Sequence, residues 1–378
     1  MEAYLDNSAT TIPSVKTRQA VMKAVSEVYG NPSSIHEKGF EALKELESSR
    51  NIIAKSLFAD ANTIYFSPSG TLANNTAIFS SVKALKRRGN KIVSTAFEHP
   101  SVENCLLRLE TEGFEVVRVF PQKDGNIPLS EFEEAIDENT ILVSVMAVNN
   151  EIGTITPFSE IKKIIKSKKS NAVLHIDAIQ GYMKMPINPQ KCGIDLMSMS
   201  AHKIHGIKGV GALYVDKNVK IKPYVEGGGQ ENNLFSGTQG MPAIMGFSAA
   251  IEDFGNIAKN LEYVKELNCF FKDRIKNLAG VFINSPENAL PYILNISVLG
   301  IPSQVLVNFF SMNKVYVSAG SACSKGHRSN VLNVIGLSPA KIDTAIRISL
   351  SHNTTKEELE YCAEILEKAI TTLRKGKN

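Results

Sequence analysis

The sequence has few cysteines, and they stand far apart. Its 378 residues include five: Cys105, Cys192, Cys269, Cys323 and Cys362. No two of them form a C-x-x-C pair, and the odd count rules out complete internal pairing. This usage argues against a disulfide framework and a zinc knuckle, and it is typical of a protein from a reducing compartment. We therefore expect one or two of these thiols at most to have a special role, and no metal site.

Long apolar runs and a basic leader are also absent. No apolar run approaches the length that spans a bilayer. The start, Met1 to Asp6, has neither the basic nor the apolar region of a signal peptide. We expect a cytoplasmic protein without a membrane partner.

A large excess of charge of one sign is the third absence. Lys and Arg total 42 and Asp and Glu total 38, so the net charge is +4. This small excess is spread along the chain and gives no case for nucleic acid as the main ligand. Hydrophobic residues make up 43% and charged residues 21%, which excludes wholesale disorder, coiled coil and collagen. A chain of 378 residues suits two domains.

The middle of the chain alternates short β-rich runs with amphipathic stretches. The pattern predicts strands at 63–66, 91–95, 114–120, 140–147, 172–177, 194–199 and 210–215. It predicts helices at 71–86, 101–112, 129–136 and 158–169. Ser130 is the expected N-cap of the helix at 129–136. The alternation indicates an α/β fold with a mostly parallel, doubly wound sheet.

The pattern changes after Gly240. We expect one long helical stretch at 242–278, strands at 281–283, 293–298, 315–317 and 345–350, and helices at 304–311 and 356–373. This order indicates a smaller α+β domain. We therefore divide the chain into an N-terminal segment at 1–14 that packs with the small domain, a large domain at 15–257 and a small domain at 258–378.

Ligands of doubly wound sheets bind at the carboxyl ends of the strands. Five polar or small-residue clusters directly follow predicted strands there: 67–71, 98–99, 149–153, 177–180 and 200–203. In the last cluster, Lys203 beside Ser200 and His202 could hold an aldehyde cofactor as a Schiff base. Taken alone, a lysine in a loop is more often simply solvated.

The other clusters add matching chemistry. Asp177 ends a buried strand, and pyridoxal phosphate needs an acidic partner on its pyridine nitrogen, although an N-cap accounts for Asp177 equally well. Gln180 could reach the phenolic oxygen, and the helix that begins near Gly70 could bind a phosphate. His99 could stack on a flat ring and move protons, although a structural histidine is as common. Each cluster meets one need of pyridoxal phosphate, so their joint occurrence favours that cofactor.

With these motifs, the sequence resembles the NifS/IscS-type cysteine desulfurases, which belong to the class V aminotransferases and to the fold type I pyridoxal phosphate enzymes. The resemblance covers nearly the whole chain. It is carried by the segments 4–11, 30–36, 148–153, 175–180, 200–203, 227–230, 236–238 and 318–324. It implies a large pyridoxal 5'-phosphate domain with a mostly parallel seven-stranded sheet, and a small domain that carries the catalytic cysteine loop.

The resemblance also implies a role for each matching residue. Lys203, Cys323 and His99 are the implied catalytic residues, and His99 stacks on the ring. The implied cofactor ligands are Gly70, Thr71, His99, Asn150, Asp177, Gln180, Ser200, His202, Lys203 and Thr238. Thr238 serves the neighbouring subunit, which implies a homodimer with shared active sites. Arg347, together with Asn150, binds the substrate carboxylate, a bidentate task for which a guanidinium fork suits better than lysine.

The implied reaction takes sulfur from L-cysteine and leaves L-alanine and a persulfide on Cys323. The persulfide then passes to a sulfur-acceptor protein for iron–sulfur cluster assembly or for thiolation of tRNA or a cofactor. Alternatives are another class V enzyme, such as an aminotransferase or a selenocysteine lyase, and a non-catalytic partner in a sulfur network. Asn232 and Phe235 stand where relatives carry arginine, which leaves the dimer-edge contacts and the acceptor open.

Overall fold

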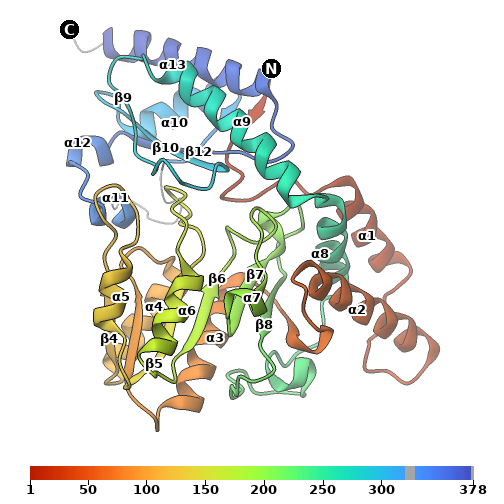
Figure 1. Ribbon diagram of the computed structural model, residues 1–378. Coiled ribbons are helices and arrows are strands. Elements are labelled where there is room, and N and C mark those ends of the chain that lie inside the picture. Colours follow the sequence, from red (N-terminus) through yellow and green to blue (C-terminus); the bar gives the residue numbers. More distant parts are fainter. Residues whose placement is uncertain (320–327, 376–378) are drawn as a thin grey trace.

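The largest sheet of the computed structural model, which describes residues 1–319 and 328–375, is an α/β sheet of seven strands. In spatial order they are β2 (Ile64–Ser67), β8 (Gly211–Val215), β7 (Leu196–Ser200), β6 (Val173–Asp177), β5 (Thr140–Met146), β3 (Lys91–Thr95) and β4 (Glu115–Val119). Within this sheet β8 alone runs antiparallel to its neighbours. The predicted mostly parallel sheet is confirmed (Figure 1).

Helices cover both faces of this sheet (Figure 1). They are α3 (Gly70–Leu85), α4 (Pro100–Thr111), α5 (Leu129–Ala135), α6 (Phe158–Ser167) and the short α7 (Pro189–Cys192). Every residue of β5 is buried, as expected for a central apolar strand covered on both sides. The predicted N-cap of α5 is wrong: Pro128 takes the N-cap position, and Ser130 lies within the first turn.

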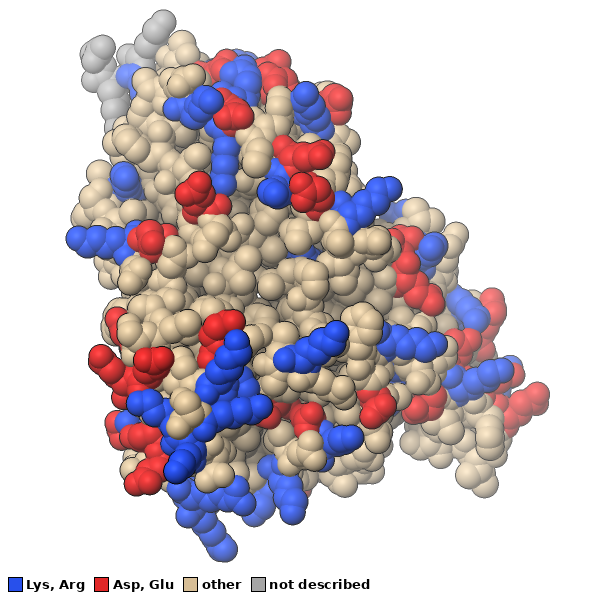
Figure 2. Space-filling view, viewed as in Figure 1, with Lys and Arg blue, Asp and Glu red and all other residues tan. Residues whose placement is uncertain are grey.

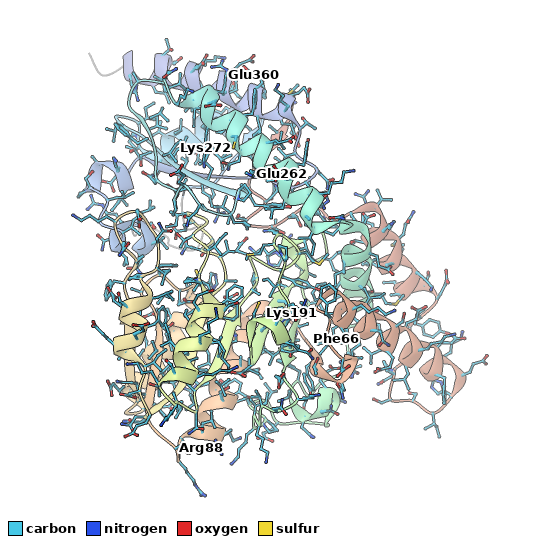
Figure 3. The ribbon with its side chains drawn as sticks, in the orientation of Figure 1. Phe66, Arg88, Lys191, Glu262, Lys272 and Glu360 are labelled. Carbon is cyan, nitrogen blue, oxygen red and sulfur yellow. The ribbon has the colours of Figure 1, made fainter. Side chains whose placement is uncertain are left out.

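The C-terminal part is built on a second, antiparallel sheet of β9 (Val281–Ile283), β10 (Ile293–Val298) and β12 (Ala345–Ser349). Around it lie α9 (Ile257–Ile275), α10 (Ser303–Met312), α11 (Asn330–Val334), α12 (Pro339–Ile342) and α13 (Lys356–Lys375). Arg274 of α9 donates to Glu360 of α13 at 2.8 Å (Figure 3 labels Glu360). This ion pair ties together the two long helices of this part.

The single helical stretch predicted at 242–278 is in fact two helices. The first, α8 (Met241–Phe254), ends at Gly255, whose φ of 72° is readily adopted only by glycine. Asn256 then begins α9, and its side chain accepts a hydrogen bond from the Lys259 amide. A glycine in an otherwise helical pattern thus marks a real break.

The N-terminal region contains elements that the sequence pattern did not predict. The helices α1 (Val15–Ser26) and α2 (Glu37–Ser56) pack against α8. Strand β1 (Ala3–Tyr4) pairs in parallel with β11 (Val315–Tyr316) of the C-terminal part.

Short 3-10 helices lie at η1 (Ala61–Thr63), η2 (Ala201–Lys203) and η3 (Gln230–Asn233). The domain boundaries at residues 14 and 257 remain predictions. In the described ranges no helix combines the length and apolarity that a membrane span requires.

Candidate active site

The polar clusters predicted at strand ends do lie along one edge of the sheet. They follow β2, β3, β5, β6 and β7, which all run in the same direction. Gly70 begins α3 directly after β2, and a Cβ atom built there would lie 2.4 Å from Ile179 Cδ1 and 3.3 Å from Ser200 Cβ. A side chain at this position would displace Ile179, so glycine favours this close approach. The Leu72 amide donates to the Ser69 side chain, and the Gly70 and Thr71 amides, which lack partners within the helix, are suited to binding an anion beside Ser200.

Asp177 is a buried carboxylate at the end of β6. Its Oδ2 accepts a hydrogen bond from Asn74 Nδ2 at 2.8 Å, and its Oδ1 accepts one from the Ile179 amide at 3.0 Å. Burial raises the pKa of Asp177, while the nearby charges of His99 and Lys203 act in the opposite direction. Within the described ranges Asp177 forms no ion pair, so this site favours a cationic group placed against the carboxylate.

His99 occupies the N-cap of α4 and belongs to the same network. Its Nδ1 accepts from the Ser101 amide at 3.1 Å and lies 2.8 Å from Ser101 Oγ. Asn74 Nδ2, which donates to Asp177, also donates to Ser101 Oγ at 2.9 Å. Burial lowers the pKa of His99, which favours a neutral imidazole. The structural and the cofactor-related interpretations of His99 are therefore compatible, because the cap uses only one edge of the ring.

Lys203 lies on η2, directly after β7, against the N-terminal segment. Its Nζ donates to the carbonyl oxygens of Ser8 at 2.6 Å and Ala9 at 2.7 Å. His202 Nδ1 lies 3.2 Å from Thr10 Oγ1. Burial, with the charge of Lys203, lowers the pKa of His202 to about 3, so this imidazole is neutral. Residues 8–10 had no predicted role, although the structure places them beside Lys203 and His202.

Gln180 is held at both ends of its carboxamide. Its Nε2 donates to the Ser8 carbonyl at 2.9 Å, and its Oε1 accepts from Lys184 Nζ at 3.0 Å. Lys184 is only 3% exposed and was missed in the sequence analysis. Its position four residues after Gln180 is the feature of the sequence that could have identified it.

Arg347 brings the smaller sheet to this edge of the large sheet. Its Nη1 donates to the Asn150 carbonyl and its Nη2 to Asp6 Oδ1, both at 2.9 Å. The arginine is 3% exposed, so this is a buried pair rather than a surface ion pair. Its Nε is buried and has no hydrogen-bond partner among the residues that the structure describes. A buried guanidinium with an unused N–H is suited to binding a carboxylate.

The structure does not bring all predicted residues together. Thr71 and Thr238 are exposed, and in the described ranges Thr238 makes no hydrogen bond to another site residue. Cys323 lies outside the described residues. Of the two positions that depart from the relatives, Asn232 is exposed, whereas Phe235 is buried and packs in the core.

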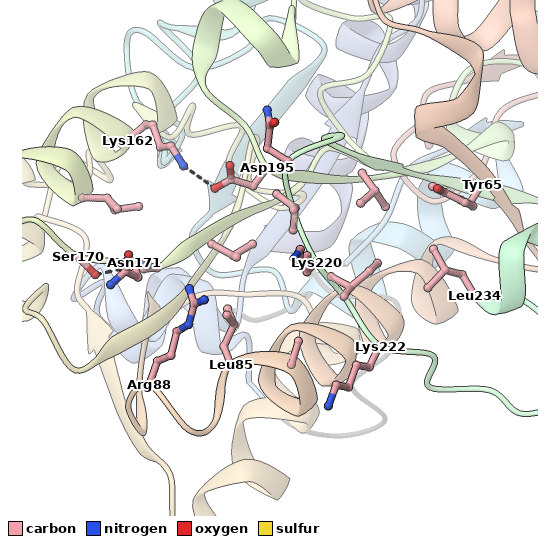
Figure 4. Close-up of a pocket in the computed structure, with 18 of the residues that line it drawn as sticks. Tyr65, Leu85, Arg88, Lys162, Ser170, Asn171, Asp195, Lys220, Lys222 and Leu234 are labelled. Carbon is pink, nitrogen blue, oxygen red and sulfur yellow. Dashed lines mark hydrogen bonds and ion pairs between the residues drawn. The ribbon is translucent and has the colours of Figure 1, made fainter.

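A separate cleft of about 910 Å³ lies at the opposite edge of the sheet, where β6 and β7 begin. Lys162, Lys220 and Lys222 line it, and Lys162 pairs with Asp195 (Figure 4). Basic side chains also gather at this lower end of the molecule (Figure 2). None of the predicted site residues lines this cleft, so it is not part of the candidate active site.

The chemistry of the donor set fits pyridoxal phosphate. The start of α3, with Ser200 and the neutral His202, suits the phosphate, and Asp177 offers the buried carboxylate that the pyridine nitrogen needs. Lys203 would supply the amine that binds the aldehyde carbon. His99 and Gln180 lie beside these groups and would contact the ring face and the phenolic oxygen.

Comparisons with known proteins agree with this geometry. The profile described as Aminotransferase class-V matches residues 3–362. A relative named cysteine desulfurase IscS, from Dictyoglomus turgidum, is 38% identical over 99% of this chain and 95% of its own length. Another of the same name, from Clostridium botulinum, is 35% identical over 99% of this chain and 95% of its own length.

Solved structures give the same result. One described as a NifS-like protein has a TM-score of 0.93 and 35% identity, over 98% of this chain and all of its own. One described as SspA in complex with cysteine has a TM-score of 0.82 and 32% identity, over 93% of this chain and 100% of its own. The chain therefore belongs to the class V aminotransferase family, in its group of NifS- and IscS-like proteins.

Proposed function

We propose that this chain is a pyridoxal phosphate-dependent cysteine desulfurase, which converts L-cysteine to L-alanine and passes the sulfur to an acceptor. The observation that carries the proposal is the convergence of Lys203, Asp177 and Arg347 on one edge of the sheet. The names of the relatives and the cysteine bound to SspA support the same substrate.

The bound cofactor supplies an electron-withdrawing ring that makes the Cα proton of the substrate acidic. Arg347 binds the substrate carboxylate and thereby fixes the direction of the Cα–H bond. Lys203 Nζ takes that proton and returns it to form alanine. Asp177 keeps the proton on the ring nitrogen, because its buried carboxylate is stabilised by a cation next to it.

Cys323 is the proposed acceptor of the sulfur atom. It lies outside the described residues, but the described residues on both sides of it contact the site. Ser318 exchanges two backbone hydrogen bonds with Arg347, at 3.1 and 2.7 Å. Ser329 donates to Glu151 Oε2 at 2.5 Å. The ends of this segment are therefore tied to the substrate arginine and to the residue that follows Asn150, which supports a role for its thiol in the reaction.

Replacing Arg347 with glutamine tests the proposal and its substrate site. The wild-type chain, loaded with pyridoxal phosphate, should form equal amounts of alanine and sulfide from L-cysteine and a thiol reductant. Arg347→Gln should raise KM for L-cysteine by about 100-fold, because a charge-assisted, bidentate contact is lost. Steady-state alanine formation measures both.

A matched control for this variant is Arg274→Gln. Arg274 of α9 pairs with Glu360 of α13 at 2.8 Å, and neither helix carries a predicted site residue. It should leave KM unchanged. An Arg347→Gln enzyme with wild-type KM, or a wild-type enzyme that forms no alanine, would contradict the proposal.

We also propose the homodimer with shared sites. An apolar surface on α1, α2 and the segment between them stays exposed in the single chain: Val15, Met22, Val25, Tyr29, Ile35 and Phe40. An apolar patch of this kind marks an interface. Thr238 is also exposed, as a residue that serves a partner must be. The acceptor protein and the cytoplasmic location remain part of this proposal, and the free state of the described cysteines fits a reducing compartment.

Placing a charge on this apolar surface should separate the subunits. Met22→Glu is expected to shift the mass from dimer toward monomer in sedimentation equilibrium, and to weaken retention of pyridoxal phosphate by about tenfold, because one phosphate contact is lost. Met312→Glu, on α10 and also exposed, is the matched control and should stay dimeric. A wild-type chain that is monomeric and fully loaded would refute the shared site.

A further inference from the structure

Lys184 is a buried amine that has no counter-charge among the described residues. Its side chain is 3% exposed, and no carboxylate acts on its pKa there. Its hydrogen-bond partner is Gln180 Oε1, at 3.0 Å, and the Tyr292 ring lies below the amine, with its centroid 5.9 Å away. A buried amine with so little compensation is costly to the fold, so its presence calls for an explanation beyond stability.

The backbone next to Lys184 is also strained. Met183, the residue before Lys184, has a φ of 61°, in the left-handed region that residues with a Cβ rarely occupy. The tight turn closes through a hydrogen bond of 3.0 Å from the Lys184 amide to the Gly181 carbonyl. Strain of this kind persists where the surrounding structure requires a side chain at one place, and it clusters at functional sites.

The hydrogen bond donated by Lys184 decides what this residue can do there. A lysine amine donates through its N–H groups in both its charged and its neutral form, whereas a carboxamide has an accepting oxygen and a donating nitrogen. Lys184 therefore fixes the Gln180 oxygen toward itself and turns the Gln180 nitrogen toward the Ser8 carbonyl. The amine of Lys203 donates to that same carbonyl, so the donor end of Gln180 faces the reactive lysine.

The surroundings of Lys184 are mainly cationic. Burial lowers the pKa of Lys184 to about 7, and the charges of Lys203 and Arg347 act in the same direction. His202 and His205 are the other titratable groups that feel its charge, and it lowers the pKa of both. The contacts described above that hold this amine in the interior are the hydrogen bond to Gln180 and the Tyr292 ring.

We propose that Lys184 is a positioning residue of the active site, which orients the Gln180 carboxamide so that its N–H groups face the phenolic oxygen of the cofactor. The inference rests on the proposed function, because it assumes that pyridoxal phosphate binds at Lys203. It adds a residue that never touches substrate or cofactor and acts through Gln180.

The test is the pH titration of the visible absorption band of the chain loaded with pyridoxal phosphate. A hydrogen bond donated to the phenolic oxygen favours its deprotonated form. Lys184→Met keeps the side-chain length but cannot donate, and it should raise the midpoint pH of the spectral change by about one unit, the size of one hydrogen bond. Lys191→Met, an exposed lysine seven residues on, should not shift it.

A double-mutant cycle separates orientation from charge. If Lys184 acts through Gln180, Lys184→Met should add less than about 0.3 units to the shift already caused by Gln180→Leu. Fully additive shifts would overturn the positioning role and leave only an effect of charge. Lys184→Gln, a neutral side chain that can still donate, should recover more than half of the shift, and a shift as large as that of methionine would contradict the inference.

The outcomes distinguish the two proposals. If the wild-type chain takes up no pyridoxal phosphate, the proposed function fails. If it loads and titrates but Lys184→Met leaves the midpoint unchanged, only the role of Lys184 fails. Thermal unfolding shows whether Lys184→Met is folded. If it is not, the midpoint shifts of Lys184→Gln and of Gln180→Leu decide whether Lys184 positions Gln180.

Discussion

Replacing Lys203 with alanine is expected to reduce the rate of alanine formation from L-cysteine by at least about 10⁴-fold. The variant should also lose the visible absorption band of the bound cofactor. Both effects follow from one amine, which binds the aldehyde carbon and then carries the substrate proton. Lys184 cannot replace it, because its Nζ is bound to Gln180 Oε1 and faces away from the donor end of that side chain.

The control for this variant is Lys208→Ala, an exposed lysine five residues further along the chain. It should keep both the band and the rate. The loss of Lys203 also removes a donor from the Ser8 and Ala9 carbonyls. Gln180 Nε2 still donates to the Ser8 carbonyl, whereas the Ala9 carbonyl loses this donor, which costs about 1–3 kcal/mol if it remains buried and unpaired. Thermal unfolding therefore has to accompany the assay. A folded Lys203→Ala chain that keeps the band and the rate would contradict the assignment.

Replacing Cys323 with serine is expected to lower sulfide release from L-cysteine by about 10³-fold or more, while the cofactor band stays intact. The described thiols offer no substitute. Cys105 and Cys362 are buried, and burial raises the pKa of Cys105 to about 11 and also raises the pKa of Cys362. Cys192 is half-buried. A nucleophilic thiol has to be accessible and readily deprotonated.

Cys269 provides a matched control, because its thiol is exposed on α9 in the part of the chain that carries the small sheet. Cys269→Ser should leave sulfide release unchanged. Sulfide release at the wild-type rate from Cys323→Ser would refute the persulfide step. It would favour another class V reaction, such as that of an aminotransferase, which needs no thiol at this position.

Much of the large sheet could be predicted from its sequence, because buried parallel strands are short apolar runs between turn residues. The run at 140–147 became β5 and the run at 91–95 became β3. The helices α1 and α2 were missed because many of their apolar side chains, such as Met22 and Phe40, remain exposed in the single chain. Their pattern therefore does not show the single apolar stripe of a helix packed on a core.

The site was predictable where it depends on strand ends, and less so where distant segments meet. Asp177, Ser200 and Lys203 directly follow or end strands, so the topology rule located them. Asp6 and Arg347 are separated by 341 residues, and long-range contacts bring the N-terminal segment to the site: the pairing of β1 with β11 and backbone hydrogen bonds to Ser349 and His202. No local pattern contains that information. Asn74 and Lys184 could have been predicted from the sequence, because each lies four residues after a predicted cofactor ligand.

The measurement that tests the central claim most directly is a single-turnover reaction with L-cysteine. The chain loaded with pyridoxal phosphate is mixed with an equal amount of L-cysteine, without reductant, and stopped. Alanine is then quantified, and the peptide that contains Cys323 is analysed by mass spectrometry. We predict alanine formation matched by the addition of one sulfur atom to Cys323. Alanine formed without added sulfur at Cys323, or no alanine at all from the loaded chain, would contradict the account.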